Sequence, residues 1–458
     1  MATAPTLEQA LTDQAAQRDA HLIEWLRIPS VSADPTHRGD IQRAAQWAMQ
    51  RLVQLGLKAE LIETSGNPLV FAETPPVPGG KRVLVYGHYD VQPADPLHLW
   101  NSPPFEPAFV DGNIVARGAT DDKGQLLTHI EGLAAWLATG RTLPVQVKFL
   151  IEGEEEVGSD GLEQWLPQHA EKVACDVVVI SDNSQFADGQ PAITYGLRGI
   201  VAFELFVEGP ASDLHSGVFG GAVLNPALAL SRILASFHGP DGRIAIPGFY
   251  DSVRALSPQE REQISQLAVD EGQLCRQLGV SELFGEPGYS VLERRWARPT
   301  LDVNGLTSGY QGTGSKTIIP AVASAKFTIR LVPEQQPEEI AKRVERHISA
   351  VAPPAVRWRL ERGHGAPGML ARIDSPSIAA ASRAIERAFG KRPVLIREGG
   401  SIPIVARFQE VLGADCLLLG WGLDDDRAHA PNEKFRLADF HRGTRASAFL
   451  WEELGNVC

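Results

Sequence analysis

Three short apolar runs, each followed directly by acidic or imidazole side chains, constrain the fold of this chain more than any other feature. The runs cover residues 82–86, 145–151 and 176–180. Their length and β-branched content are typical of buried strands. In open α/β sheets, ligands bind beyond the carboxyl ends of the strands, where loops converge without interrupting the sheet's hydrogen bonds. We therefore expect an α/β domain with a mainly parallel, helix-covered sheet and a polar site at that edge.

The residues after the first two runs are of types that bind metals. His88 and Asp90 point the same way in an extended chain, so the carboxylate can hold one imidazole nitrogen while the other faces a cation. The second run leads into four glutamates within five residues, and the last three of them lie between Gly153 and Gly158. A cation explains this crowding of like charge, although a solvated helix start has a similar composition.

Three further candidates lie in other segments. Asp182 follows the third run, Asp121 lies in a glycine-bounded loop before a predicted helix over 125–137, and His429 lies in the segment RAHAP. Each residue alone is more typical of a turn, an N-cap or polar surface than of a metal site. Together, the segments supply enough oxygen and nitrogen ligands for two divalent cations.

Nine motifs occur in an order found in a known family: VLVYGHYDVQP, ARGATDDKGQ, EGEEEVGS, ISDN, DLHSGVFGG, GSKTIIP, IRLVPEQ, REGGSIP and AHAPNEKF. With them, the chain resembles the two-metal aminoacylase, carboxypeptidase and dipeptidase group of metallohydrolases. Within that group it is most similar to the carnosinase-like, nonspecific dipeptidases. The resemblance extends from about residue 20 to the last predicted helix.

The resemblance implies a role for each polar residue of the site. His88 and Asp182 would bind one metal, Glu156 and His429 the other, and Asp121 both. Asp90 would orient His88, and Glu155 would be the general base, since the register set by Gly158 and Ser159 favours it over Glu154. The family also leads us to expect a cis peptide bond between Asp121 and Asp122.

The resemblance implies metal-dependent hydrolysis of dipeptides, and this set of residue types suits a metal-dependent hydrolase. Two imidazoles and three carboxylates favour zinc, while an oxygen-rich site also admits manganese or cobalt. We expect two divalent cations per subunit, with zinc as the first choice. Such a pair activates water, and Glu155 would take the water's proton and deliver it to the leaving amine.

The resemblance also implies residues that hold the substrate. Arg330 would clamp the substrate carboxylate, a role suited to a planar guanidinium, although an arginine on an edge strand can also be plain surface. His215 would reach the partner subunit's active site in a homodimer and polarise the developing oxyanion. The further candidates for substrate contacts are Thr317, Ser401, Asn225 and His364.

The pattern of predicted elements divides the chain into two domains. Strands and helices alternate up to residue 195, and a helix over 375–389 and the strand-like CLLLG resume this pattern later. We therefore predict a discontinuous catalytic domain over 1–195 and 367–458. The order strand, helix, strand, strand, helix over 196–366 predicts an inserted α/β sandwich with an antiparallel sheet. The resemblance implies that this domain serves as a lid and in dimerisation.

Composition excludes several other classes of protein. The formal charge of −13 argues against nonspecific nucleic-acid binding, which needs a basic face. No run approaches the roughly 20 apolar residues of a membrane span, and the N-terminal segment lacks the apolar core of a signal peptide, so we expect a cytoplasmic protein. The four cysteines contain no C-x-x-C pair that would indicate a thiolate metal site.

Two other functions stay open. An N-acyl amino acid deacylase or desuccinylase of the same superfamily would use the same metals and base, and would differ only in its substrate pocket. A noncatalytic binding protein that kept the fold is a more remote alternative. The adjacent pair Glu155 and Glu156 argues against it, because a binding protein does not need a base beside the metals.

Overall fold

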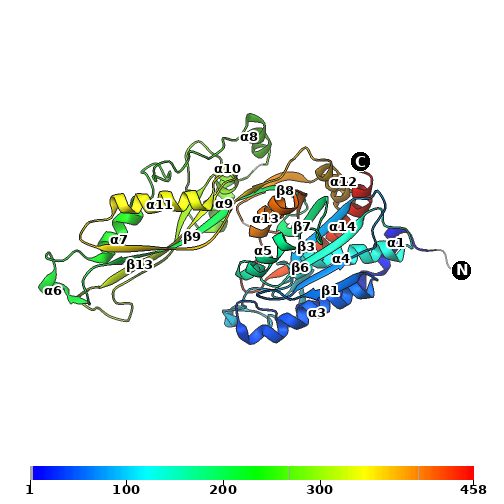
Figure 1. The fold of residues 1–458 in the computed structure, drawn as a ribbon, viewed down its shortest axis with the longest axis horizontal. Helices are drawn as coiled ribbons and strands as arrows, with labels where there is room; N and C mark the ends of the chain where they lie inside the picture. The colour runs from blue at the N-terminus through cyan, green and yellow to red at the C-terminus, as the bar shows by residue number, and fades with distance from the viewer. Residues whose placement is uncertain (1–3, 268, 401, 458) are drawn as a thin grey trace. The chain divides into compact units, whose positions relative to one another are not determined.

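A computed structural model describes residues 4–267, 269–400 and 402–457 of the chain. The chain forms two compact units (Figure 1). Among the described residues, no helix combines the length and the apolar character needed to cross a membrane.

Unit 1 is discontinuous in sequence. It contains the residues up to Tyr195, the segment Ala371–Ile396, and the residues from Arg407 onward. Unit 2 contains Gly196–Leu370 and Arg397–Ala406. The roles of lid and dimerisation domain for unit 2 stay predictions.

The main sheet, most of whose strands belong to unit 1, is mixed, with parallel pairs at its centre. In spatial order its strands are β1 (Lys58–Ile62), β2 (Leu69–Glu73), β6 (Gln146–Glu152), β3 (Arg82–His88), β7 (Val177–Ser184), β17 (Asp415–Gly422) and β8 (Ala192–Leu197), with β15 (Met369–Leu370) and β16 (Val394–Glu398) pairing to β8. The pairs β6–β3, β3–β7 and β7–β17 are parallel, whereas β1–β2, β2–β6 and β17–β8 are antiparallel. The predicted α/β class is confirmed, and the flanking antiparallel strands make the sheet more mixed than expected.

The register of the central strands brings the polar residues to one edge. His88 at the end of β3 pairs with Glu152 at the end of β6. Tyr86 of β3 pairs with Ile180 of β7. His88 and Asp182 each come two residues later on these strands, so they lie at the same level of the sheet.

Helices cover both faces of this sheet. One face packs on α1 (Leu7–Asp13), α2 (Ala15–Leu26), α3 (Arg38–Gln54), α4 (Lys123–Ala138), α12 (Pro376–Phe389) and α14 (Leu437–Gly455). The other face meets α13 (Pro403–Leu412), where the Phe408 ring lies 5.1 Å from the ring of Tyr86. Burial on both faces explains why the central strands read as continuous apolar runs.

Unit 1 also contains smaller elements. They are a three-stranded sheet of β18 (Lys434–Arg436), β5 (Asn113–Val115) and β4 (Ala108–Val110), the helix α5 (Asp160–Trp165), and the 3₁₀ turns η1 (Pro35–His37), η2 (Leu97–Leu99), η3 (Glu155–Val157) and η4 (Leu166–Gln168).

Unit 2 is built on an antiparallel sheet with helices on one face. The strand order is β11 (Thr300–Ser308), β13 (Val322–Leu331), β9 (Gly199–Glu208) and β14 (Arg357–Ala366). Alternate residues of β9 and β13 are buried against α7 (Pro226–Ala235) and α11 (Pro337–Val351). The remaining elements are the ribbon of β10 (Leu214–His215) and β12 (Ile318–Ile319), with α6 (Ser216–Phe219), α8 (Pro258–Ser265), α9 (Glu271–Leu278) and α10 (Val291–Ala297). The predicted α/β sandwich with an antiparallel sheet is confirmed.

Candidate metal centre

His88 is the fully buried last residue of β3. Its Nδ1 lies 3.1 Å from the carbonyl oxygen of Asp90 and 3.3 Å from that residue's Oδ1. The residue before it, Gly87, must lack a side chain, because a Cβ there would lie 2.6 Å from Asp122 Oδ2. That Asp122 oxygen accepts a hydrogen bond from the His88 backbone N–H at 3.2 Å. Asp90 therefore holds the imidazole at Nδ1, Asp122 holds the His88 backbone, and Nε2 is directed away from Asp90.

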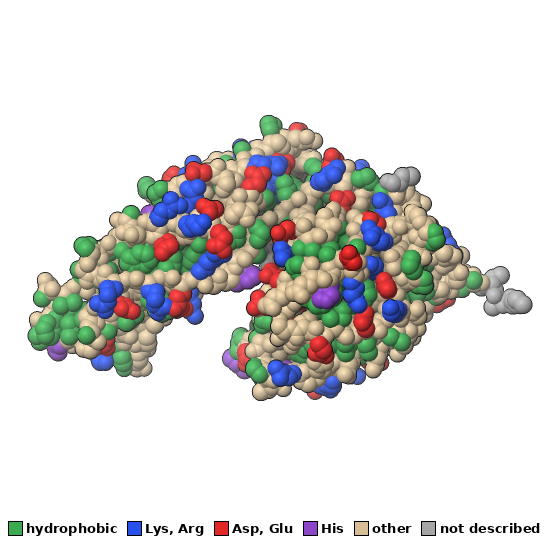
Figure 2. Space-filling view, viewed as in Figure 1, with side chains coloured by type: hydrophobic (Ala, Val, Ile, Leu, Met, Phe, Trp, Pro, Cys, Tyr) green, Lys and Arg blue, Asp and Glu red, His purple; other side chains and the backbone are tan. Residues whose placement is uncertain are grey.

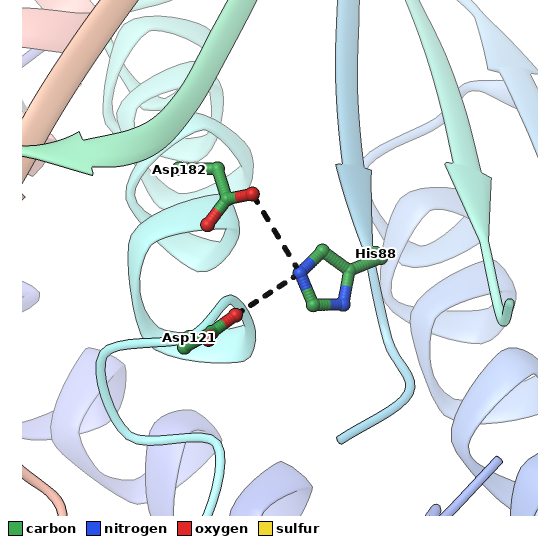
Figure 3. Close-up of side chains that lie close together, drawn as sticks. All are labelled: His88, Asp121 and Asp182. Atoms are coloured by element: carbon green, nitrogen blue, oxygen red, sulfur yellow. Dashed lines mark ion pairs between the residues drawn. The ribbon is translucent and has the colours of Figure 1, made fainter. Parts of the chain in front are cut away.

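Two acidic side chains face His88 Nε2 (Figure 3). Oδ1 of Asp121, from the loop before α4, lies 3.2 Å away, and Oδ2 of Asp182, from β7, lies 3.9 Å away. These three residues form a group whose ligand atoms all lie within 4.8 Å of one another. They come from three separate segments. His88 and Asp182 lie close because β3 and β7 are parallel neighbours, and Asp121 reaches them from the loop before α4.

A second group shares Asp121. Its Oδ2 lies 2.8 Å from Nε2 of His429, and the same nitrogen lies 3.2 Å from Oε2 of Glu156. Asp121, Glu156 and His429 again have ligand atoms within 4.8 Å of one another. The structure thus brings the five sequence-predicted metal ligands into two groups, with Asp121 in both. The Asp121–Asp122 peptide bond is cis, as expected.

The charges of this cluster suit bound cations. Burial raises the pKa of Asp182 well above its usual range, and the charge of Asp121 adds to the shift. Hydrogen bonds to Asp121 and Glu156 raise the pKa of His429 to about 11. Among the described residues, His88 Nε2 is a buried atom without a hydrogen bond of acceptable geometry. A donor set of two imidazoles and three carboxylates, crowded and partly buried, fits two divalent cations because they would neutralise the gathered negative charge.

Glu155 lies beside this cluster without joining it. The residue begins the 3₁₀ turn η3, and among the described residues it belongs to neither ligand group. Burial raises the pKa of Glu155 to about 8, with the nearby Glu156 and Asp121 adding to the shift and His88 opposing it. Asp90 reaches the same turn, since its Oδ2 accepts a hydrogen bond from the Glu156 backbone N–H at 3.2 Å.

Two residues with contacts to this centre were not predicted as functional. Gln92 donates from Nε2 to Oε2 of Glu156 at 2.8 Å. Glu433 accepts hydrogen bonds from the loop that carries Asp121. Both lie inside motifs that carried the family resemblance, VLVYGHYDVQP and AHAPNEKF. Their place in these motifs could have marked both residues as functional candidates, but a motif does not show which partner a side chain contacts.

The predicted substrate residues of unit 2 lie in several elements. His215 and Thr317 lie together at the β10–β12 ribbon, where His215 pairs with Ile318. Asn225 caps α7 by accepting a hydrogen bond from the Ala227 backbone N–H at 2.9 Å. Both His215 and Thr317 are exposed to solvent.

The remaining candidates lie on or after strands. Arg330 is near the end of β13, where burial lowers the pKa of its guanidinium and Asp302 opposes the shift. His364 is an exposed residue of β14, at an irregularity in its pairing with β9. Ser401 lies outside the described residues.

Comparison with known proteins places this geometry in context. The model of "Peptidase family M20/M25/M40" matches residues 84–453. The chain is 36% identical over 448 residues to "Cys-Gly metallodipeptidase dug1" of Schizosaccharomyces pombe, covering 94% of each chain. Its fold is similar to crystal structures of human carnosine dipeptidase 1 (TM-score 0.87, 33% identity, 99% of each chain) and of the M20 family metallo-carboxypeptidase Sso-CP2 from Sulfolobus solfataricus (TM-score 0.87, 32% identity, 96% of this chain and 99% of that one).

Proposed function

Because the chain belongs to peptidase family M20/M25/M40, we propose that it is a metal-dependent dipeptidase that uses two divalent cations at the centre around Asp121. The observation that carries the proposal is the placement of the Asp121 carboxylate, whose oxygens lie 3.2 Å from His88 Nε2 and 2.8 Å from His429 Nε2. A carboxylate between two ligand groups suits a shared ligand of two cations. Zinc is the first choice, with manganese and cobalt as alternatives.

The residues of unit 1 have distinct roles in this proposal. His88 and Asp182 hold one cation, Glu156 and His429 hold the other, and Asp121 holds both. When bound, two such cations lower the pKa of a water molecule and polarise the scissile carbonyl. Glu155 accepts the water's proton and passes it to the leaving amine. Asp90 orients the His88 imidazole through Nδ1.

We assign substrate binding to unit 2. The Arg330 guanidinium clamps the carboxylate of the dipeptide, because its planar fork matches a carboxylate. His215 polarises the carbonyl oxygen on which negative charge develops. Supporting contacts come from Thr317, Ser401, Asn225 and His364. The curated dipeptidase relatives support this choice of substrate over N-acyl amino acids.

A homodimer through unit 2 belongs to the same proposal. Strand β11 lies at the edge of its sheet and carries Val303 and Leu306 with exposed side chains. Further exposed apolar side chains, including Val218 and Phe219, gather at the α6 end of unit 2 (Figure 2). An exposed edge strand with apolar neighbours favours pairing with a second copy. The cytoplasmic location expected from the sequence stays a prediction.

One panel of substrates tests the proposed activity. Chelated protein, resupplied with zinc or manganese, is offered Ala-Ala, β-Ala-His, Leu-Gly, N-acetyl and N-succinyl amino acids, and a tripeptide. We expect metal-restored cleavage of the dipeptides. Cleavage confined to acylated amino acids would identify a deacylase, preference for the tripeptide would indicate an exopeptidase of longer peptides, and no cleavage of any substrate would support a noncatalytic protein.

A further inference from the structure

The loop that carries Asp121 is neither helix nor strand. It lies between β5 and α4. A residue shared by two cations must present both carboxylate oxygens at fixed positions, so the backbone beneath it needs support. That support comes from the far end of the chain.

The fully buried carboxylate of Glu433 accepts four hydrogen bonds from this loop. Its Oε1 accepts from the backbone N–H groups of Thr120 at 2.9 Å and Asp121 at 3.1 Å. Its Oε2 accepts from the backbone N–H of Gly118 at 2.9 Å and from the Arg117 guanidinium at 2.8 Å. Charge-assisted hydrogen bonds of this kind are stronger than neutral ones, so the carboxylate fixes the loop firmly.

Glu433 also lies on the segment that supplies His429. Both residues fall between β17 and β18, and Asp426 of the same segment accepts a hydrogen bond from the Thr120 hydroxyl at 3.2 Å. The neighbouring Asn432 fastens the segment to residues 99–101, accepting from Asn101 N–H at 2.7 Å and donating to the Leu99 carbonyl at 2.8 Å. One segment therefore sets the position of His429 and of the backbone that carries Asp121.

We propose that Glu433 is a positioning residue for the metal centre: by holding the backbone of residues 118–121, it fixes Asp121 between its two groups of ligands before any cation binds. The inference rests on the proposed function. Among the described residues Glu433 belongs to neither ligand group, so it acts through Asp121 and not as a ligand. Burial raises the pKa of Glu433 to about 7; the charge of Arg117 opposes this shift and the charge of Asp121 adds to it. Cations bound to Asp121 would offset the effect of the Asp121 charge.

The variant Glu433→Gln tests this role through zinc affinity. In either orientation of the glutamine amide, its NH₂ group faces N–H groups that now donate to the carboxylate, so those hydrogen bonds are lost. We expect zinc binding at both sites of the chelated variant to weaken by about 10-fold to 100-fold, because Asp121 is shared. Competition with a chromophoric chelator measures this without reference to activity.

A matched control separates positioning from loss of stability. Glu131 of α4 is a buried carboxylate that accepts hydrogen bonds from His21 at 2.9 Å and from Arg51 at 2.8 Å. Glu131→Gln should lower the melting temperature and leave zinc affinity within about twofold of the wild type. Equal zinc affinity in Glu433→Gln and the wild type would overturn this inference and leave the proposed function standing. A wild-type protein that does not bind two zinc ions would overturn the proposed centre and this inference with it.

Hydrogen exchange in the wild type covers the case in which Glu433→Gln does not fold. In the chelated protein, the backbone amides of Gly118, Thr120 and Asp121 should already exchange slowly, because Glu433 accepts them without metal. Mass spectrometry with fragmentation resolves this segment. Rapid exchange that becomes slow only when zinc is added would show that the cations order the loop, and would overturn the inference.

Discussion

At the scale of single residues, Glu154 and Glu155 are neighbours in the chain with different surroundings. Glu154 Oε2 accepts a hydrogen bond from the Gly161 backbone N–H at 3.1 Å, whereas Glu155 lies next to the ligand Glu156 at the start of η3. Glu155→Gln should reduce kcat on a dipeptide by about two to four orders of magnitude, since it removes the proton acceptor. Its zinc content, measured by mass spectrometry, should match the wild type.

Glu154→Gln is the matched control for this prediction. It makes the same chemical change one residue away, and we expect kcat to stay within a few-fold of the wild type. Near-normal turnover by Glu155→Gln, or an equal loss in both variants, would contradict the assignment of Glu155 as the base.

His129 predicts a pH dependence of stability. The imidazole is fully buried in α4 between the hydroxyls of Ser181, at 2.7 Å, and Ser447, at 3.0 Å. Burial lowers the pKa of His129 to about 3, from 6.5. Below pH 6.5 the unfolded chain binds a proton at this residue that the folded protein does not bind, so stability falls with pH from 6.5 towards 3.

The variant His129→Gln isolates this contribution, because it cannot take up the proton. Between pH 7 and pH 5 the wild type should lose about 2 kcal/mol more free energy of unfolding than the variant, at 1.36 kcal/mol for each pH unit below 6.5. Urea unfolding at the two pH values measures the difference. Parallel losses in the two proteins would show that His129 titrates normally in the folded state.

At the scale of elements, Asn225 has a structural role that competes with its predicted contact to substrate. Its side chain caps α7, and Asn225→Ala should cost about 1 kcal/mol of unfolding free energy. Asn225→Asp keeps an acceptor at the cap and should unfold like the wild type. If capping is its only role, KM should stay unchanged in both variants. A higher KM in Asn225→Asp at normal stability would support the contact to substrate.

The sequence predicted the elements whose pattern is local. The run over 82–86 became β3, and the predicted helices over 125–137 and 375–389 became α4 (Lys123–Ala138) and α12 (Pro376–Phe389). These elements follow from β-branched runs, helical periodicity and a Ser375 cap. The antiparallel strands beside the parallel centre were not predicted, because strand pairing depends on contacts between distant segments.

The same distinction applies to the site. Asp121, Glu156 and His429 were predicted because family motifs mark them and their side chains are of ligand types. Gln92 and Glu433 were missed because their roles depend on which atoms they contact, at 2.8 Å from Gln92 Nε2 to Glu156 Oε2 and at 3.1 Å from the Asp121 N–H to Glu433 Oε1. The partner of Gln92 lies 64 positions away and that of Glu433 lies 312 positions away, and no spacing in the sequence encodes such contacts.

At the scale of the whole molecule, the proposed dimer makes each active site depend on two chains. If His215 acts across the interface, the site of one subunit uses its own Glu155 and the partner's histidine. In a mixed dimer of His215→Ala and Glu155→Gln chains, one site then carries both defects and the other carries neither. If His215 acts within its own subunit, every site of the mixed dimer keeps one defect.

Mixing the two inactive proteins distinguishes these arrangements. Random exchange of subunits makes about half of the dimers mixed, so about a quarter of wild-type activity should return for action across a two-fold interface. Native mass spectrometry confirms that mixed dimers have formed, and each variant incubated alone is the control. Mixed dimers without activity would place His215 in its own subunit's reaction. A protein that stays monomeric at micromolar concentration would instead show that the exposed edge of β11 and the α6 end of unit 2 do not pair two copies of the chain.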